Sequence, residues 1–172
     1  MRLGYRLLQF WQALWSAPTQ ADLEEAGALL PPNMMELFLR MQTSEQAHSL
    51  RVFHELLEIG QTQPELLAAA LLHDVGKSIY PLRLWERVWI VIGKALFPKK
   101  VKSWGQGAPR GWRRAFVVAE KHPTWGAELA AQAGAAPLTT ELIRRHQEAP
   151  LAHPAAINEA LLETLQRFDD RA

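Results

Sequence analysis

A histidine followed directly by an aspartate, His73-Asp74, ends an apolar run in the 172-residue chain. Imidazole nitrogens and carboxylate oxygens are ligands that first-row divalent metals accept in proteins. The chain has six histidines and four aspartates, and six of these ten residues form one ordered set: His48, His73, Asp74, His122, His146 and Asp169. This clustering predicts a metal centre with hydrolytic chemistry.

The absence of cysteine restricts the metals that such a centre can hold. With only nitrogen and oxygen ligands available, Mn, Fe, Co, Mg or a similar divalent ion is expected, and one or two ions fit the number of ligands. Two ions about 3.5–4 Å apart activate water and polarise a phosphoryl group. The predicted chemistry is therefore hydrolysis of a phosphate ester.

The elements that must position these side chains are helices. Apolar residues recur at helical spacing, and no segment shows the alternation of a β-strand. We predict an all-α fold, a helical bundle of roughly eight or nine helices. The segments expected to be helical, ten in number and in part short or adjoining, cover about residues 3–15, 22–30, 33–41, 43–59, 66–75, 82–96, 112–121, 123–133, 139–147 and 155–170.

Glycine, proline and capping residues set the expected helix ends. Gly76 is expected to terminate the helix that carries the His-Asp pair. Asn33 is expected to cap a helix, with Glu36 completing a capping box. Pro123 is expected to begin a helix, with His122 at its threshold.

Charge is distributed unevenly along the chain, although the net charge is only +1. Residues 81–114 contain nine basic residues and one acidic residue, a net charge of +8, and residues 98–111 are expected to be irregular. This segment is also rich in tryptophan and favours a negatively charged partner such as phosphate or anionic lipid. A lid over a pocket, core tryptophans, a docking surface and a solvated loop all remain open for it.

We expect residues 1–40 to form N-terminal helices that pack on the core, and residues 41–172 to form the main domain, with 81–114 as a basic, Trp-rich insertion. The chain has no run of about 20 apolar residues and no recognisable signal peptide. A cytoplasmic location is expected. Residues 1–16 and 81–114 add the expectation of peripheral contact with anionic membranes.

The order of the six ligand candidates resembles that of the HD-domain metal-dependent phosphohydrolases. Residues 73–77, His-Asp-Val-Gly-Lys, are similar to the HDIG form of the motif, and residues 122–129 resemble the segment that carries an extra metal-binding histidine in HD-GYP-like members. Residues 145–148, Arg-His-Gln-Glu, resemble the next histidine motif of those members. The GYP signature is missing from residues 149–154, which argues against hydrolysis of cyclic di-GMP.

The resemblance implies one metal held by His48, His73, Asp74 and Asp169. It implies a second metal that Asp74 bridges and that His122 and His146 hold. Asp170 competes with Asp169 for the last position, because Phe168 stands where the family has a small residue.

Catalysis is assigned to Asp74 and Lys77. Lys77 would also bind the phosphate, whose charge grows during attack. Arg51, Arg144 and Arg145 are further candidates for phosphate binding.

The leading interpretation is an enzyme that hydrolyses a phosphomonoester or phosphodiester of nucleotide type with metal-activated water. Its partner would be a phosphorylated small molecule, and sequence-specific nucleic-acid binding is not expected. The alternative is a non-catalytic HD domain that binds a nucleotide or a protein partner as a regulator.

Overall fold

The computed structural model describes residues 17–149 and 157–171. In these ranges the chain forms nine α-helices, α2 to α10, and two short 3-10 helices, η1 and η2, with no strand. The predicted all-α fold is confirmed. The bounds are α2 Gln20–Leu29, α3 Pro32–Leu39, α4 Thr43–Glu58, α5 Pro64–Leu72, η1 Val75–Ile79, α6 Leu84–Leu96, α7 Pro98–Trp104, η2 Gly111–Arg113, α8 Arg114–Gln132, α9 Pro137–Arg145 and α10 Ile157–Asp169. The predicted helix at residues 3–15 lies outside the described residues.

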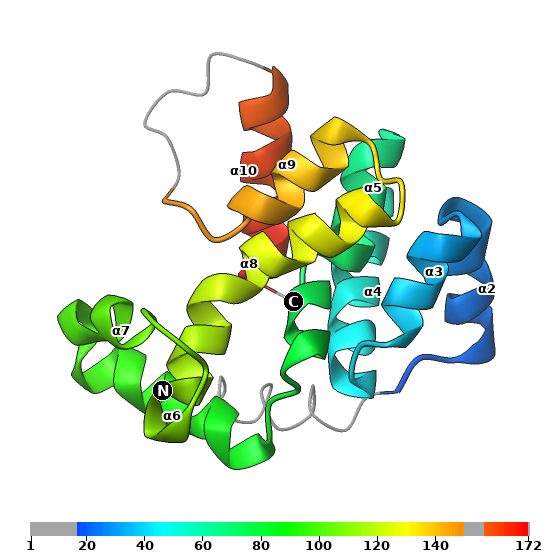
Figure 1. The fold of residues 1–172 in the computed structure, drawn as a ribbon. Coiled ribbons are helices and arrows are strands. Elements are labelled where there is room, and N and C mark those ends of the chain that lie inside the picture. Colours follow the sequence, from blue (N-terminus) through cyan, green and yellow to red (C-terminus); the bar gives the residue numbers. More distant parts are fainter. Residues whose placement is uncertain (1–16, 150–156, 172) are drawn as a thin grey trace, which may run out of the picture.

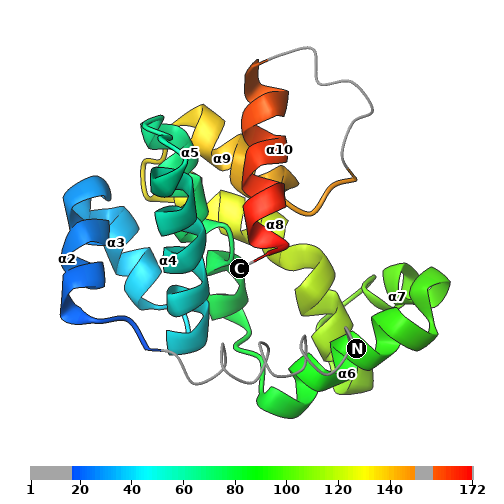
Figure 2. The same cartoon turned by 180° about the vertical axis from the view of Figure 1, so that it is seen from behind.

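Helices α4, α5, α8 and α9 form the centre of the molecule, with α2 and α3 on one side and α10 on the other (Figure 1). One continuous apolar core joins these helices, and its fully buried side chains include Phe38, Leu56, Leu71 and Ile143. Helix α5 is buried along almost its whole length, as its apolar sequence predicts. Figure 2 shows α6 and α7 apart from this core, beside the first half of α8.

The helix that carries the His-Asp pair ends earlier than its sequence predicts. Helix α5 stops at Leu72, His73 is its C-cap, and the 3-10 helix η1 follows from Val75. Gly76 therefore does not end the helix but lies inside η1, against α8. A Cβ atom at this position would overlap the carbonyl oxygen of His122 and lie 2.6 Å from the backbone nitrogen of Gly126. Glycine is thus required by the close approach of η1 to α8.

Helix α8 is continuous where the sequence predicts two helices. It runs from Arg114 to Gln132 with Pro123 in its interior, so His122 lies in the middle of a helix. Proline lacks the N–H that would bond to the carbonyl of residue 119. The Nδ1 atom of His122 lies 3.0 Å from that carbonyl, on Ala119, and supplies the missing donor. The prediction of a helix start at Pro123 was wrong for this reason.

Two further expectations about helix ends are corrected. Helix α3 begins at Pro32 with no side-chain cap, so Asn33 lies inside the helix and caps nothing. Residues 98–111 are not irregular throughout, because Pro98 starts α7 at a position that tolerates a missing N–H. In the described residues no helix is long and apolar enough to span a membrane.

Candidate metal centre

Six side chains converge between α4, α5, α8, α9 and α10, and they form two groups of three potential metal ligands. In the first group, the Nε2 atom of His48 lies 2.8 Å from Oδ1 of Asp169, and the Nε2 atom of His73 lies 3.3 Å from the same oxygen. Two ligand atoms bound at about 2.1 Å to one ion lie about 3.0–3.4 Å apart. The spacing is therefore close to that of ligands sharing one ion.

The second group lies deeper in the protein. The Nε2 atom of His122 lies 3.2 Å from Oδ1 of Asp74 and 3.3 Å from Nε2 of His146, and all three residues are buried. Asp74 also links the two groups, because its Oδ2 atom lies 3.8 Å from Nε2 of His73. The first group is more open: the side chains of His48 and Asp169 are 21% and 20% exposed.

Hydrogen bonds to helix carbonyls orient three of these histidines in a common way. His73 and His146 are the C-caps of α5 and α9, and their Nδ1 atoms each lie 2.8 Å from the carbonyl oxygen three residues earlier. His122 uses its Nδ1 atom similarly within α8. A carbonyl oxygen only accepts hydrogen bonds, so Nδ1 carries the proton as the donor in each ring. In the neutral ring, Nε2 is then left bare to face the centre.

This arrangement fits a bound divalent metal. Metal-binding histidines typically donate their second ring nitrogen to a carbonyl or carboxylate, which fixes the tautomer and the ring orientation. The Nε2 atom of His73 is fully buried and makes no well-directed hydrogen bond, although Oδ1 of Asp169 lies 3.3 Å away. A buried polar atom without a partner costs free energy, and coordination of a cation would satisfy it. His48, His73 and Asp169 fit one ion, and Asp74, His122 and His146 fit a second.

The charges of the centre also fit a bound divalent metal. Burial lowers the pKa of His73, but the carboxylates of Asp169 and Asp74 outweigh it and raise this pKa to about 9. Burial, with His73 and His122 nearby, lowers the pKa of His146 to about 3. Without an ion, a protonated His73 is thus the counter-charge of two carboxylates. Metal binding requires the neutral imidazole, so a divalent ion would replace this proton.

Lys77 lies at the edge of the centre, one turn of η1 from the His-Asp pair. Its Nζ atom is 2.5 Å from Oδ2 of Asp74, and its side chain is 21% exposed. Burial alone would raise the pKa of Asp74, but Lys77 and His73 hold it well below its usual range. Lys77 therefore keeps Asp74 ionised and presents a positive charge beside it.

Among the described residues, none of the three candidate phosphate-binding arginines pairs with a ligand candidate of the centre. Arg145 makes hydrogen bonds with Glu141, Glu148 and Glu159, at 2.8–3.0 Å. These carboxylates raise the pKa of its guanidinium above its ordinary value. Because all its nitrogens are engaged, Arg145 joins α9 to α10, and we do not retain it as a phosphate ligand. Arg144 is exposed on α9, and Arg51 is half-buried on α4, one turn beyond His48.

His54 and Asp170 are close in sequence to His48 and Asp169 but do not belong to the ligand groups. His54, six residues after His48 on α4, has its Nε2 atom 2.9 Å from Glu25 of α2 and is not part of the centre. Asp170 lines the pocket described below, but it is Asp169 that contacts His48 and His73.

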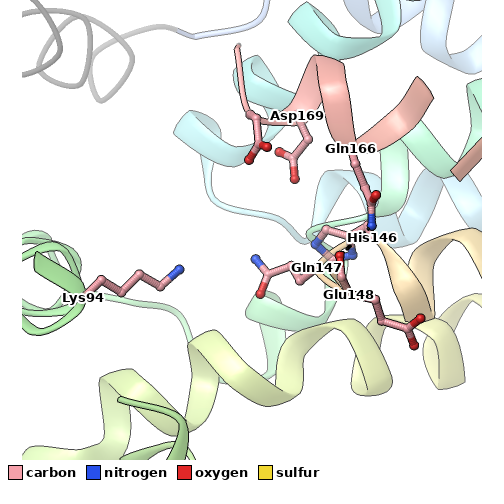
Figure 3. Close-up of a pocket in the computed structure, with 7 residues that line it drawn as sticks. Lys94, His146, Gln147, Glu148, Gln166 and Asp169 are labelled. Carbon is pink, nitrogen blue, oxygen red and sulfur yellow. Dashed lines mark hydrogen bonds between the residues drawn. The ribbon is translucent and has the colours of Figure 1, made fainter. Parts of the chain in front are cut away.

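A pocket of about 270 Å³ opens onto the centre, where Asp169 of the first ligand group and His146 of the second line it. Its lining residues are drawn in Figure 3: Lys94, His146, Gln147, Glu148, Gln166, Asp169 and Asp170. Sequence reasoning missed Lys94, Gln147 and Gln166. Gln166 lies one helical turn before Asp169 and donates hydrogen bonds to the carbonyls of Arg145 and Glu148. The one-turn spacing from Asp169 is a signal that would have found it, whereas nothing in the sequence indicates Lys94.

Comparisons with known proteins agree with this geometry. The family model described as HD domain matches residues 46–170, a range that contains all six ligand candidates. Searches of curated proteins and of solved structures give no match. Since the matched range covers most of the chain, the chain belongs to the HD domain family.

Proposed function

We propose that the protein is a metal-dependent phosphohydrolase that acts on a small phosphate ester of nucleotide type. The observation that carries the proposal is the convergence of four imidazole Nε2 atoms and two carboxylates into two adjacent groups. HD domains are generally metal-dependent hydrolases, which supports the same conclusion.

The open side of the centre gives the direction of substrate entry. His48 and Asp169 are partly exposed, whereas Asp74, His122 and His146 are buried. A phosphate group therefore approaches from the pocket that Asp169 and His146 line. Metal ions held by the two ligand groups would supply activated water and polarise the phosphoryl group. Water adds to phosphorus and the P–O ester bond breaks, so a monoester gives phosphate and an alcohol, and a diester gives a phosphomonoester and an alcohol.

The protein's own contribution is position and charge. Asp74 presents Oδ1 to His122 and Oδ2 to Lys77, so its carboxylate is held in one orientation. Lys77 places an ammonium group where negative charge develops on the phosphoryl oxygens, which stabilises the transition state.

The test combines metal analysis with a phosphatase assay. We expect the purified protein to contain Mn, Fe, Co or a similar ion and to release nitrophenol from an aryl phosphate. His48→Gln is expected to lower the rate more than about a hundredfold, by removing a ligand of the first group. His54→Gln is the matched control, because His54 lies on the same helix but contacts Glu25 instead. Equal activity in the two variants would contradict the proposal.

The regulator alternative predicts a different result. A protein without metal whose melting temperature rises with nucleotides, and which turns over none of them, would be a binding domain. The complete ligand set argues against this alternative, because a pure binder has no need of all six side chains. Chelation provides a further check, since removal of a bound ion lowers the melting temperature by mass action.

A further inference from the structure

The pocket over the metal centre adjoins a second pocket along α6 and α7. The second pocket has a volume of about 320 Å³. Lys94 and Gln147 line both pockets, and we call the two adjoining pockets together the groove. Figure 3 shows Lys94 reaching from α6 toward Gln147 and Asp169 across the first pocket.

The charge changes sign along this groove. The inner pocket contains the carboxylates of Glu148, Asp169 and Asp170 together with Lys94. A divalent ion at the first ligand group would offset the charge of Asp169, and Arg145 pairs with Glu148. The outer pocket contains the two cations Lys94 and Lys102 and one carboxylate, Glu120. Among the described residues, neither lysine forms an ion pair, and both are exposed. Each ammonium group is therefore free to bind an anion from solution.

We propose that Lys94 and Lys102 bind a second phosphate group of the substrate, away from the phosphate that reacts. The substrate class is then an organic phosphate that carries two separate phosphoryl groups. Pro98 and Val101 add apolar surface to the outer pocket. This surface suits a carbon linker between the two phosphoryl groups. This inference rests on the proposed function, because it names the substrate class of the same site.

The test uses simple substrates of graded length. Phosphate release is measured for alkyl monophosphates and for alkanediol bisphosphates with linkers of two to eight carbons, and kcat/KM is compared. We expect one range of linker lengths to exceed the monophosphate by about tenfold, the effect of charge-assisted contacts at an exposed site. The ratio is expected to decrease at high salt, because exposed charges are screened.

Two double variants localise the effect. K94A/K102A is expected to bring the ratio of bisphosphate to monophosphate close to one. K99A/K100A removes the same charge from α7, at two lysines that line neither pocket, and is expected to keep the ratio. A wild-type ratio near one, or equal loss in both variants, would overturn the inference.

Failure of the proposed function gives a separate result. If no phosphate ester is hydrolysed, the binding of alkane bisphosphonates and monophosphonates is measured by calorimetry. Tighter binding of bisphosphonates that K94A/K102A removes and K99A/K100A keeps would support the second phosphate site alone. No such preference would exclude it.

Discussion

The metal centre and the α6–α7 segment both differ from the usual arrangement of polar side chains outside and apolar side chains inside, but in opposite ways. The centre buries charged and polar groups, with His73 and His122 fully inaccessible to solvent. The α6–α7 segment exposes large apolar groups, with Trp85 57% and Leu96 66% accessible. Buried ionisable groups and exposed apolar patches are both uncommon in a small soluble domain.

The two regions also differ in how the free-energy cost is offset, which is the burial of polar groups in the centre and the exposure of apolar groups in the α6–α7 segment. In the centre, hydrogen bonds from Nδ1 atoms to carbonyls satisfy one side of each buried ring, and a bound cation would satisfy the other. In the α6–α7 segment, Trp104 and Trp112 pack on Phe116. The apolar stripe of α6 at Trp85, Trp89, Ile92 and Leu96 stays exposed. The buried groups of the centre thus have hydrogen-bond partners on one side, whereas the apolar stripe of α6 has no covering element among the described residues.

The largest effect is expected at Asp74, the residue that joins both ligand groups. Asp74→Ala removes a carboxylate oxygen from the second group and the counter-charge of Lys77. We expect activity to fall by roughly a thousandfold or more, with little change in the helical circular dichroism signal. Retained activity would show that the buried polar groups serve stability alone.

Gly76 tests whether the centre depends on close backbone contact. Gly76→Ala places a methyl group against the carbonyl of His122 and forces η1 away from α8. We expect a loss of stability of about 1–3 kcal/mol in urea denaturation. Gly27→Ala is the matched control, because nothing lies within 4 Å of the added atom in α2. There we expect no loss, since alanine is the better helix former.

A substitution at Pro123 is expected to change the stability of the fold and the metal affinity of the centre in opposite directions. Pro123→Ala restores an N–H that competes with Nδ1 of His122 for the carbonyl of Ala119. We expect metal affinity of the second group to fall by about tenfold, while the metal-free protein becomes more stable. Metal titration and thermal melting measure the two effects. Changes of the same sign in both would contradict this account of the proline.

The smallest effect concerns the exposed stripe of α6. Arg87 pairs with Glu45 and Arg114 pairs with Glu86, and seven other basic residues of 81–114 form no ion pair in the described residues. We expect binding to anionic but not neutral vesicles, weakening with salt, through these cations and the apolar stripe. W85S/L96S is expected to reduce sedimentation with vesicles several-fold and to leave phosphatase activity unchanged. Dimer formation without vesicle binding would instead assign the stripe to a second copy of the chain.

The sequence was sufficient to predict the all-α fold and the six residues that converge, because motif order and helical spacing are local properties. It misplaced His122 at a helix start, because proline inside a helix is tolerated only when a neighbour satisfies the freed carbonyl. The neighbour that satisfies this carbonyl is the His122 side chain, whose orientation depends on the folded site. Arg145 looked like an anion ligand because the glutamates of α9 and α10 that surround it are not evident as partners in the sequence.

Lys94 could not be predicted at all. Its role depends on where α6 lies relative to α9 and α10, and no residue pattern within α6 encodes that placement. The exposed face of α6 was open to several interpretations for the same reason.

The position of Asp169 in α10 has a consequence for cleavage of the chain. A cut between α9 and α10 would separate Asp169 from the other five ligand candidates in the covalent chain. The triad of His48, His73 and Asp169 would then be held together only by the packing of α10 on α4, α5 and α9.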